Sequence, residues 1–168
     1  MTVAPRHSGV YLFTFEYCNG YIVYAAGLTR RPIRTRLREH TRKYISGNYN
    51  VLDVAAIQRG LREEVWHGWG WSEEKRRAFE QRKAIILDAV RKQLGAFRIF
   101  VADVSAEGRI PERIEAAIMN ALGQARRPFR DIPDEGMHLA RRWKSEKVIV
   151  ATNTCRDKLY GLPSRLEI

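Results

Sequence analysis

Two strand-like segments near the start of the chain constrain its fold more than any other feature. Residues 10–15 and 21–26 are rich in aromatic and β-branched side chains, which favour strands. Between them, Cys18-Asn19-Gly20 is typical of a tight turn. The pattern predicts a β-hairpin.

An arginine-rich helix is predicted to follow the hairpin directly. Pro32 suits the first turn of a helix, where its missing N–H costs nothing. Gly47 is the expected end of this helix. Apolar and aromatic side chains then recur at helical spacing and predict a face packed on the hairpin: Ile33, Leu37, His40 and Tyr44.

Two capping residues mark further helices in the middle of the chain. Asp53 is expected to cap a short helix over residues 54–58. Ser72, followed by two glutamates, is the expected N-cap of a long helix over residues 73–94 that Gly95 closes.

The remaining elements alternate between strand and helix. Residues 97–104 are almost continuously apolar, which predicts a third strand buried on both faces. Pro111 opens a helix that Gly123 is expected to end, and residues 148–151 suggest a short final strand. The elements predict an α/β fold with a small, mainly antiparallel three-stranded sheet flanked by helices.

The charge of the chain points to a polyanionic partner. Its 168 residues, a length that predicts one domain over residues 1–168, carry 30 Lys and Arg against 19 Asp and Glu, for a net charge of +11. The basic residues recur within predicted folded segments, at residues 30–43, 76–83, 126–130 and 141–147. Charge spread in this way indicates a nucleic-acid-binding face. The alternative is a merely soluble basic protein.

Cysteine use and hydropathy exclude several other classes. Cys18 and Cys155 are far apart and form no zinc-binding pair. Reduced thiols, no signal-peptide pattern at the start and no apolar stretch long enough to span a bilayer predict a cytoplasmic protein without a membrane partner.

Three residues on two predicted helices carry side chains suited to chemistry on a phosphodiester. Arg36 and His40 are four residues apart and share a helix face, where they can bind phosphate and exchange a proton. Glu115 lies at the margin of an apolar helix face, where a carboxylate needs a partner such as a cation. The ordinary alternatives are a solvated arginine, a histidine at the edge of the core and a salt-bridged glutamate.

These residues stand in an order that resembles the GIY-YIG nuclease family. Gly9-Val10-Tyr11 looks like the family's first motif, and Ala25-Ala26-Gly27 looks like its second. Arg36 to His40 is similar to its Arg-Leu-x-x-His helix, and Arg113-Ile114-Glu115 to its metal-binding segment. The match covers roughly residues 8–46 and 97–122. It leaves a helical insertion at about 48–95 and a C-terminal extension at about 124–168.

The resemblance implies a role for each matched residue. Tyr11 would position the attacking water or relay its proton, and His40 would assist proton transfer. Arg36 would stabilise the phosphate in the transition state. Glu115 would bind one divalent cation, magnesium or manganese, and a single carboxylate favours a one-metal site.

The second motif departs from the family at Ala25, where a tyrosine is expected. Tyr24 is adjacent, but successive side chains on a strand point to opposite faces. A bulge would let Tyr24 enter the site, so Tyr24 is a further catalytic candidate. Without it, the chain would be a catalytically degenerate, GIY-YIG-like nucleic-acid-binding module.

The insertion suggests how nucleic acid would be held. Tryptophans in the segment 66–71 can stack on bases or can pin the insertion to the core. Candidate nucleic-acid-binding residues are Arg34, Arg38, Lys43, Trp69, Arg76 and Arg77. The sequence and the resemblance together predict a metal-dependent endonuclease that hydrolyses phosphodiester bonds, with DNA as the expected substrate.

Overall fold

The β-hairpin at the start of the chain forms the centre of the fold. The structure is a computed structural model that describes residues 9–70, 72–105, 107–134 and 140–168. Strands β1 (Gly9–Tyr17) and β2 (Gly20–Thr29) pair antiparallel through almost their whole length, with Tyr11 opposite Gly27. The turn between them places Cys18 in the left-handed region, at φ 50°. The predicted hairpin is confirmed.

The main sheet has four strands, not the three predicted, and it is mixed. Its order is β5-β1-β2-β7, with β5 (Arg98–Asp103) antiparallel to β1. The additional strand β7 (Leu159–Tyr160) comes from the C-terminal extension and pairs parallel with β2. A two-residue strand is too short to leave a periodic signal in the sequence, so the prediction missed it.

Strand β5 corrects a second expectation, because it is not buried on both faces. It lies at the edge of the sheet, and Arg98, Ala102 and Asp103 are exposed. Its apolar side chains pack on different sides instead: Ile99 and Val101 against the core around Tyr11, and Phe100 against the core under α4.

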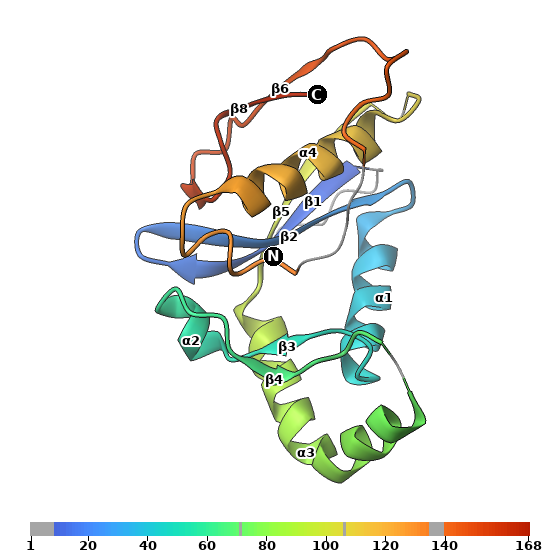
Figure 1. The fold of residues 1–168 in the computed structure, drawn as a ribbon, viewed down its shortest axis with the longest axis vertical. Coiled ribbons are helices and arrows are strands. Elements are labelled where there is room, and N and C mark those ends of the chain that lie inside the picture. Colours follow the sequence, from blue (N-terminus) through green and yellow to red (C-terminus); the bar gives the residue numbers. More distant parts are fainter. Residues whose placement is uncertain (1–8, 71, 106, 135–139) are drawn as a thin grey trace.

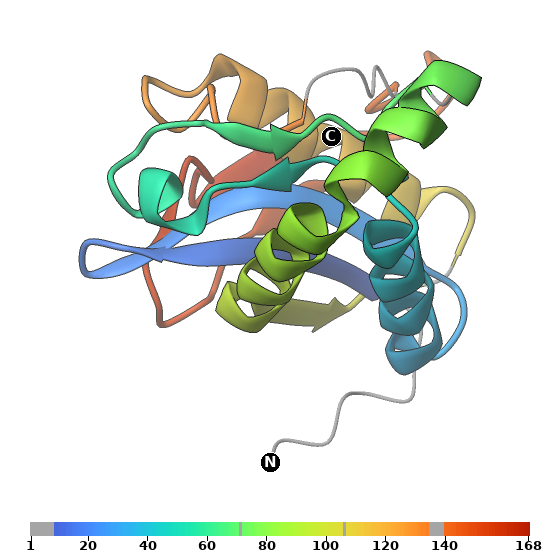
Figure 2. The ribbon, with the colours of Figure 1, turned by 90° about the horizontal axis from the view of Figure 1, so that it is seen from below.

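Helices cover both faces of the sheet (Figure 1). Helix α1 (Ile33–Ile45) and helix α3 (Glu73–Ala96) contact one another, and Figure 2 shows them together in front of the sheet. Helix α4 (Ile110–Gln124) covers the other face, where Ile118 and Leu122 pack against Val10 and Leu12 of β1. The two faces of β1 therefore belong to two different cores.

The capping predictions hold, but two helix ends differ. Asp53 accepts a hydrogen bond from the Ala56 N–H at the start of α2 (Val54–Gln58), and Ser72 accepts one from Lys75 at the start of α3. Gly95 and Gly123 lie inside the last turns of α3 and α4 instead of ending them.

The insertion is not purely helical. Strands β3 (Val51–Leu52) and β4 (Glu64–Trp66) form a small antiparallel sheet between α1 and α3. Trp66 is buried there and donates its Nε1 hydrogen to the carbonyl of Gly47, so it pins the insertion to the end of α1. Trp71 lies outside the described residues.

The part of the C-terminal extension that contains β6 and β8 packs on the α4 side of the molecule, whereas Phe129 and Ile132 join the core around Tyr11. Strands β6 (Val150–Thr152) and β8 (Arg165–Glu167) pair antiparallel. The buried guanidinium of Arg113, on α4, donates to main-chain oxygens of Arg141, Lys147 and Ile168 and so attaches this segment to the helix. No helix in the described part of the chain is long and apolar enough to cross a membrane.

A prediction follows from the pairing of Tyr11 with Gly27. A Cβ at residue 27 would overlap the ring and hydroxyl of Tyr11, which is buried and cannot swing into solvent. We expect Gly27→Ala to lower the free energy of unfolding by about 1–3 kcal/mol, measured by urea denaturation.

Gly123→Ala is the matched control. It lies in α4 with open space around its Cα, so alanine should stabilise the helix by about 0.5–1 kcal/mol. Equal effects of the two substitutions would contradict a tight contact between Tyr11 and Gly27.

Candidate active site

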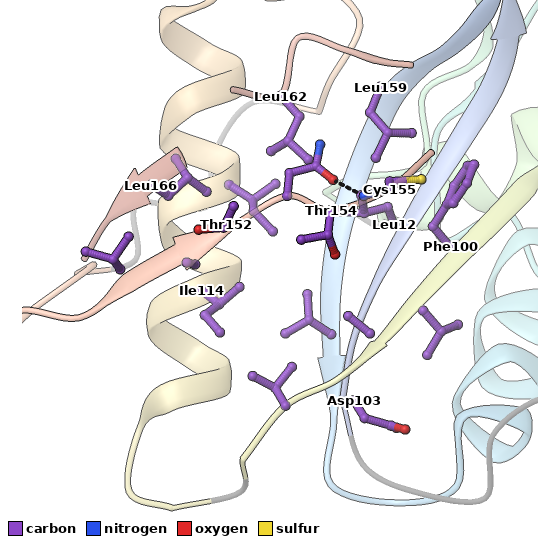
Figure 3. A pocket seen from close by; sticks show the side chains of 18 of the residues that line it. Leu12, Phe100, Asp103, Ile114, Thr152, Thr154, Cys155, Leu159, Leu162 and Leu166 are labelled. Carbon is purple, nitrogen blue, oxygen red and sulfur yellow. Dashed lines mark hydrogen bonds between the residues drawn. The ribbon is translucent and has the colours of Figure 1, made fainter. Parts of the chain in front are cut away.

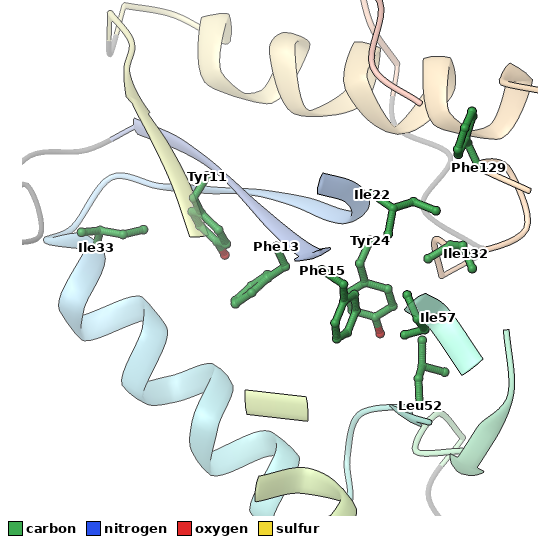
Figure 4. Close-up of a cluster of buried hydrophobic side chains, with 10 residues drawn as sticks. All are labelled: Tyr11, Phe13, Phe15, Ile22, Tyr24, Ile33, Leu52, Ile57, Phe129 and Ile132. Carbon is green, nitrogen blue, oxygen red and sulfur yellow. The ribbon is translucent and has the colours of Figure 1, made fainter. Parts of the chain in front are cut away.

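The hydroxyl of Tyr11 is the centre of the candidate site. Tyr11 is 1% exposed, and its side chain points from β1 toward α1 (Figure 4). Its oxygen lies 2.6 Å from Nε2 of His40 and 3.3 Å from Nε of Arg36. Because Arg36 donates to this oxygen, the Tyr11 hydrogen is free to bond Nε2 of His40. The two helix residues thus meet one tyrosine.

Burial sets the protonation of this pair. It lowers the pKa of His40 to about 4, with a further lowering from the Arg36 charge, so the ring is neutral near pH 7. Burial raises the pKa of Tyr11, and the hydrogen bond from Arg36 partly opposes that rise. At neutral pH the pair is therefore a protonated tyrosine bonded to a histidine that can accept its proton.

Glu115 joins the site from the opposite side of the sheet. It lies one turn before Met119, whose sulfur accepts the Ala26 N–H at 3.3 Å, so α4 crosses the part of β2 that pairs with Tyr11. Glu115 is 7% exposed, and burial raises its pKa to about 7 although Arg36 lowers it. Its charge also raises the pKa of Tyr11. Glu115 and Arg36 therefore act in opposite directions on the pKa of Tyr11, and Arg36 also lowers the pKa of His40.

The carboxylate of Glu115 fits a single divalent cation. In the described part of the chain, it has no hydrogen bond or ion pair from another residue, although a buried carboxylate normally needs one. Carboxylate oxygen is a ligand that magnesium and manganese prefer. Among the described residues, no group of three His, Cys, Asp or Glu side chains gathers as a closed metal site. A cation here would rely on water and substrate oxygens for its other ligands.

Tyr24 reaches the Tyr11 face of the sheet through a β-bulge. The register of β2 shifts between Phe13 and Thr14 of β1, which skips Tyr24. Tyr24 therefore points to the same side as Ala25 and packs between Phe15 and Phe97. Its hydroxyl donates to Asp134 at 2.8 Å (Figure 4 shows the side chain). The structure thus places Tyr24 in a separate hydrogen-bond network from Tyr11.

Asp134 is the centre of that second network. Its Oδ1 accepts from Arg62 at 2.6 Å and from Asn50 at 2.9 Å, and its Oδ2 accepts from Tyr24. Trp69 Nε1 lies 3.5 Å from the same Oδ2. One carboxylate therefore joins β2, the insertion and the C-terminal extension.

The predicted nucleic-acid-binding residues separate into groups. Lys43 is exposed on α1, three residues after His40 and on the same helix face. Arg34 and Arg38 are exposed about half a turn away from that face. Arg76 and Arg77 pair with Glu73 at the start of α3. Trp69 is 48% exposed, and its ring lies beside that of Tyr49.

Tyr49 is a site residue that the sequence did not reveal. Its ring centroid lies 5.6 Å from that of His40, the residue that bonds the Tyr11 hydroxyl. It follows the end of α1 in an irregular segment, where no periodicity reports which way a side chain points. The Gly47 helix end was the one available signal that the chain turns back there.

A cavity of about 590 Å³ lies elsewhere, between β1, β5, α4 and the C-terminal segment (Figure 3). Its walls are mainly apolar and include Leu12, Phe100, Ile114 and Leu166. Tyr11, Arg36, His40 and Glu115 are not among the residues that line it, so the cavity is not the candidate site.

Comparison of the chain with protein-family models, with curated proteins and with solved structures found no match.

A prediction follows from the raised pKa of Glu115. Its carboxyl holds a proton more tightly in the folded state, so it contributes stability below its ordinary pKa, and this is lost as the pH rises through about 7. We expect Glu115→Gln, measured with a chelator present, to be more stable than wild type by on the order of 2 kcal/mol at pH 8, after allowance for solvent screening.

The gain should disappear at pH 4, where both side chains are neutral. Glu167→Gln, on exposed β8, controls for the loss of one negative charge. A stability difference that stayed constant between pH 4 and pH 8 would contradict the raised pKa.

Proposed function

We propose that this chain is a metal-dependent endonuclease of the GIY-YIG type that hydrolyses phosphodiester bonds in DNA, in the cytoplasm. One observation carries the proposal: the Tyr11 hydroxyl is held between Nε2 of a neutral His40 and the Arg36 guanidinium. The buried Glu115, on α4, would supply the carboxylate for the metal ion. The net charge of +11 suits the substrate.

In this proposal Tyr11 and His40 move the proton of the attacking water. The water oxygen forms a bond to phosphorus and gives its proton to the Tyr11 oxygen, while the Tyr11 proton passes to Nε2 of His40. The bond from phosphorus to the leaving oxygen breaks, and that oxygen departs with the bonding electrons and takes a proton from solvent. A bound phosphate brings negative charge that offsets Arg36 and so favours the protonated imidazole. The 2.6 Å separation of the two atoms suits this transfer.

Arg36 would bind the phosphate while it orients Tyr11. Its side chain is 35% exposed, so part of the guanidinium remains accessible to substrate. Hydrogen bonds to Tyr11 and Glu39 raise its pKa against the effect of burial, which keeps it charged. Glu115 would hold one magnesium or manganese ion, which when bound stabilises the negative charge on the leaving oxygen.

A second function is favoured by Ala25 and by the engagement of Tyr24 with Asp134. The same scaffold would then bind nucleic acid without cutting it. Binding would weaken steeply with salt, because counterions are released when basic side chains meet phosphates. In this alternative the protein still binds nucleic acid but does not hydrolyse its phosphodiester bonds.

Cleavage of plasmid DNA with magnesium or manganese tests the proposal. We expect nicking or linearisation by wild type, none in a chelator, and none by Glu115→Ala. Tyr11→Phe keeps the ring and removes the proton relay, so it should slow cleavage by about 10²–10⁴-fold.

Glu167→Gln should cut like wild type, because its exposed strand lies outside the site. Metal-independent cleavage, or cleavage that survives Glu115→Ala, would contradict the mechanism. Salt-sensitive binding with no cleavage under any metal would favour the binding module.

A further inference from the structure

A line of aromatic rings leads from the candidate site to the surface. The Tyr49 ring lies 5.6 Å from the His40 ring, at an angle of 38° between their planes. The Trp69 ring lies 5.5 Å from the Tyr49 ring, at 43°. His40 in turn bonds Tyr11. Trp69, which is 48% exposed, is thus two ring contacts away from the proton-accepting histidine.

The position of Trp69 is fixed although its ring is exposed. A Cβ on Gly68 would overlap the backbone of Tyr49, so the two segments touch directly. The Gly68 N–H donates to Oδ1 of Asn50, and Asn50 donates to Asp134. Nε1 of Trp69 reaches the same aspartate at 3.5 Å. A rigid exposed ring loses little conformational entropy when a ligand stacks on it.

The insertion uses its two described tryptophans differently. Trp66 is 6% exposed, contacts Phe79 and donates to Gly47, so it supplies the packing that holds the insertion to the core. Trp69 exposes about half of its surface beside the candidate site. Packing inside the protein accounts for the whole Trp66 side chain, whereas about half of the Trp69 side chain remains available to a ligand.

Trp143 shows what an occupied tryptophan face looks like in the same molecule. It is 55% exposed, but the guanidinium of Arg109 lies 3.8 Å from the centre of its ring. That face is covered by a side chain of the protein itself. Trp143 is therefore a matched control for the exposure of Trp69 without its place beside His40.

We propose that the exposed ring of Trp69, supported from behind by Tyr49, forms a stacking site for one unpaired base next to the phosphate that is cut. Bases in a continuous duplex are stacked on each other, so only an unpaired or displaced base offers a free face to this ring. The preferred substrate class is then DNA with an unpaired nucleotide beside the cleavage point. The cationic Lys43 on the His40 face would contact the flanking backbone. This inference rests on the proposed function.

Binding can be measured without cleavage. Two DNA hairpins are needed, one with a fully paired stem and one with a single unpaired 2-aminopurine in the stem. The protein carries Glu115→Gln and is kept in a chelator, so the DNA stays intact. We expect tighter binding to the unpaired hairpin and quenching of the 2-aminopurine fluorescence.

Substitution of Trp69 separates stacking from packing. Trp69→Leu keeps an apolar side chain but cannot stack, and it should weaken binding to the unpaired hairpin by about 10- to 100-fold. Trp69→Phe can still stack and should keep most of the preference. Trp143→Leu should change neither the affinity for the unpaired hairpin nor the preference for it over the paired one. Thermal unfolding of each variant shows that it is folded.

Three results would overturn the inference: equal effects of leucine and phenylalanine at residue 69, equal losses for both hairpins, or equal affinities of the unsubstituted protein for both. Its failure is distinct from failure of the proposed function. Cleavage by wild type without a preference for the unpaired hairpin refutes the stacking site alone. A preference without cleavage refutes the nuclease and leaves the stacking site standing.

Discussion

The buried hydroxyl of Tyr11 is the constraint on which the arrangement depends. A phenol in the interior needs hydrogen-bond partners, and here α1 provides both of them from residues four positions apart. This fixes how α1 lies against β1. The same ring fills the space above Gly27, so β2 must have glycine there. The pairing of β1 with β2, the position of α1 and the candidate site therefore all depend on how the Tyr11 side chain is buried.

Burial then turns a structural contact into a reactive one. Low exposure keeps His40 neutral and Glu115 reluctant to ionise, while Arg36 stays charged through its hydrogen bonds. The Arg36 charge lowers the pKa of both His40 and Glu115, so it favours the neutral imidazole and partly offsets the cost of ionising the carboxyl. Such perturbed groups gather at functional sites more often than elsewhere.

Local rules predicted much of this fold, and long-range pairing limited the rest. Turn and capping residues located the hairpin and the starts of the helices, and helical spacing put Arg36 and His40 together. The predicted burial of β5 was wrong because a central strand and an edge strand that packs against two different cores have the same apolar run in the sequence. The predicted bulge at Tyr24 is present. The hydrogen-bond partner of Tyr24, Asp134, could not be predicted, because it lies 110 residues away in the sequence. Tyr49 and β7 were missed for the same reason.

The carboxylate of Asp134 has a consequence for how the molecule loses structure. It joins β2, the insertion and the segment after α4 through bonds to Tyr24, Asn50 and Arg62. Unfolding the insertion or the segment after α4 would separate Arg62 from Asp134 and leave a partly buried charge without its counterion, and unfolding β2 would remove the Tyr24 hydroxyl from the same carboxylate. The three segments should therefore open together as one cooperative unit in hydrogen exchange, although they are far apart in the sequence.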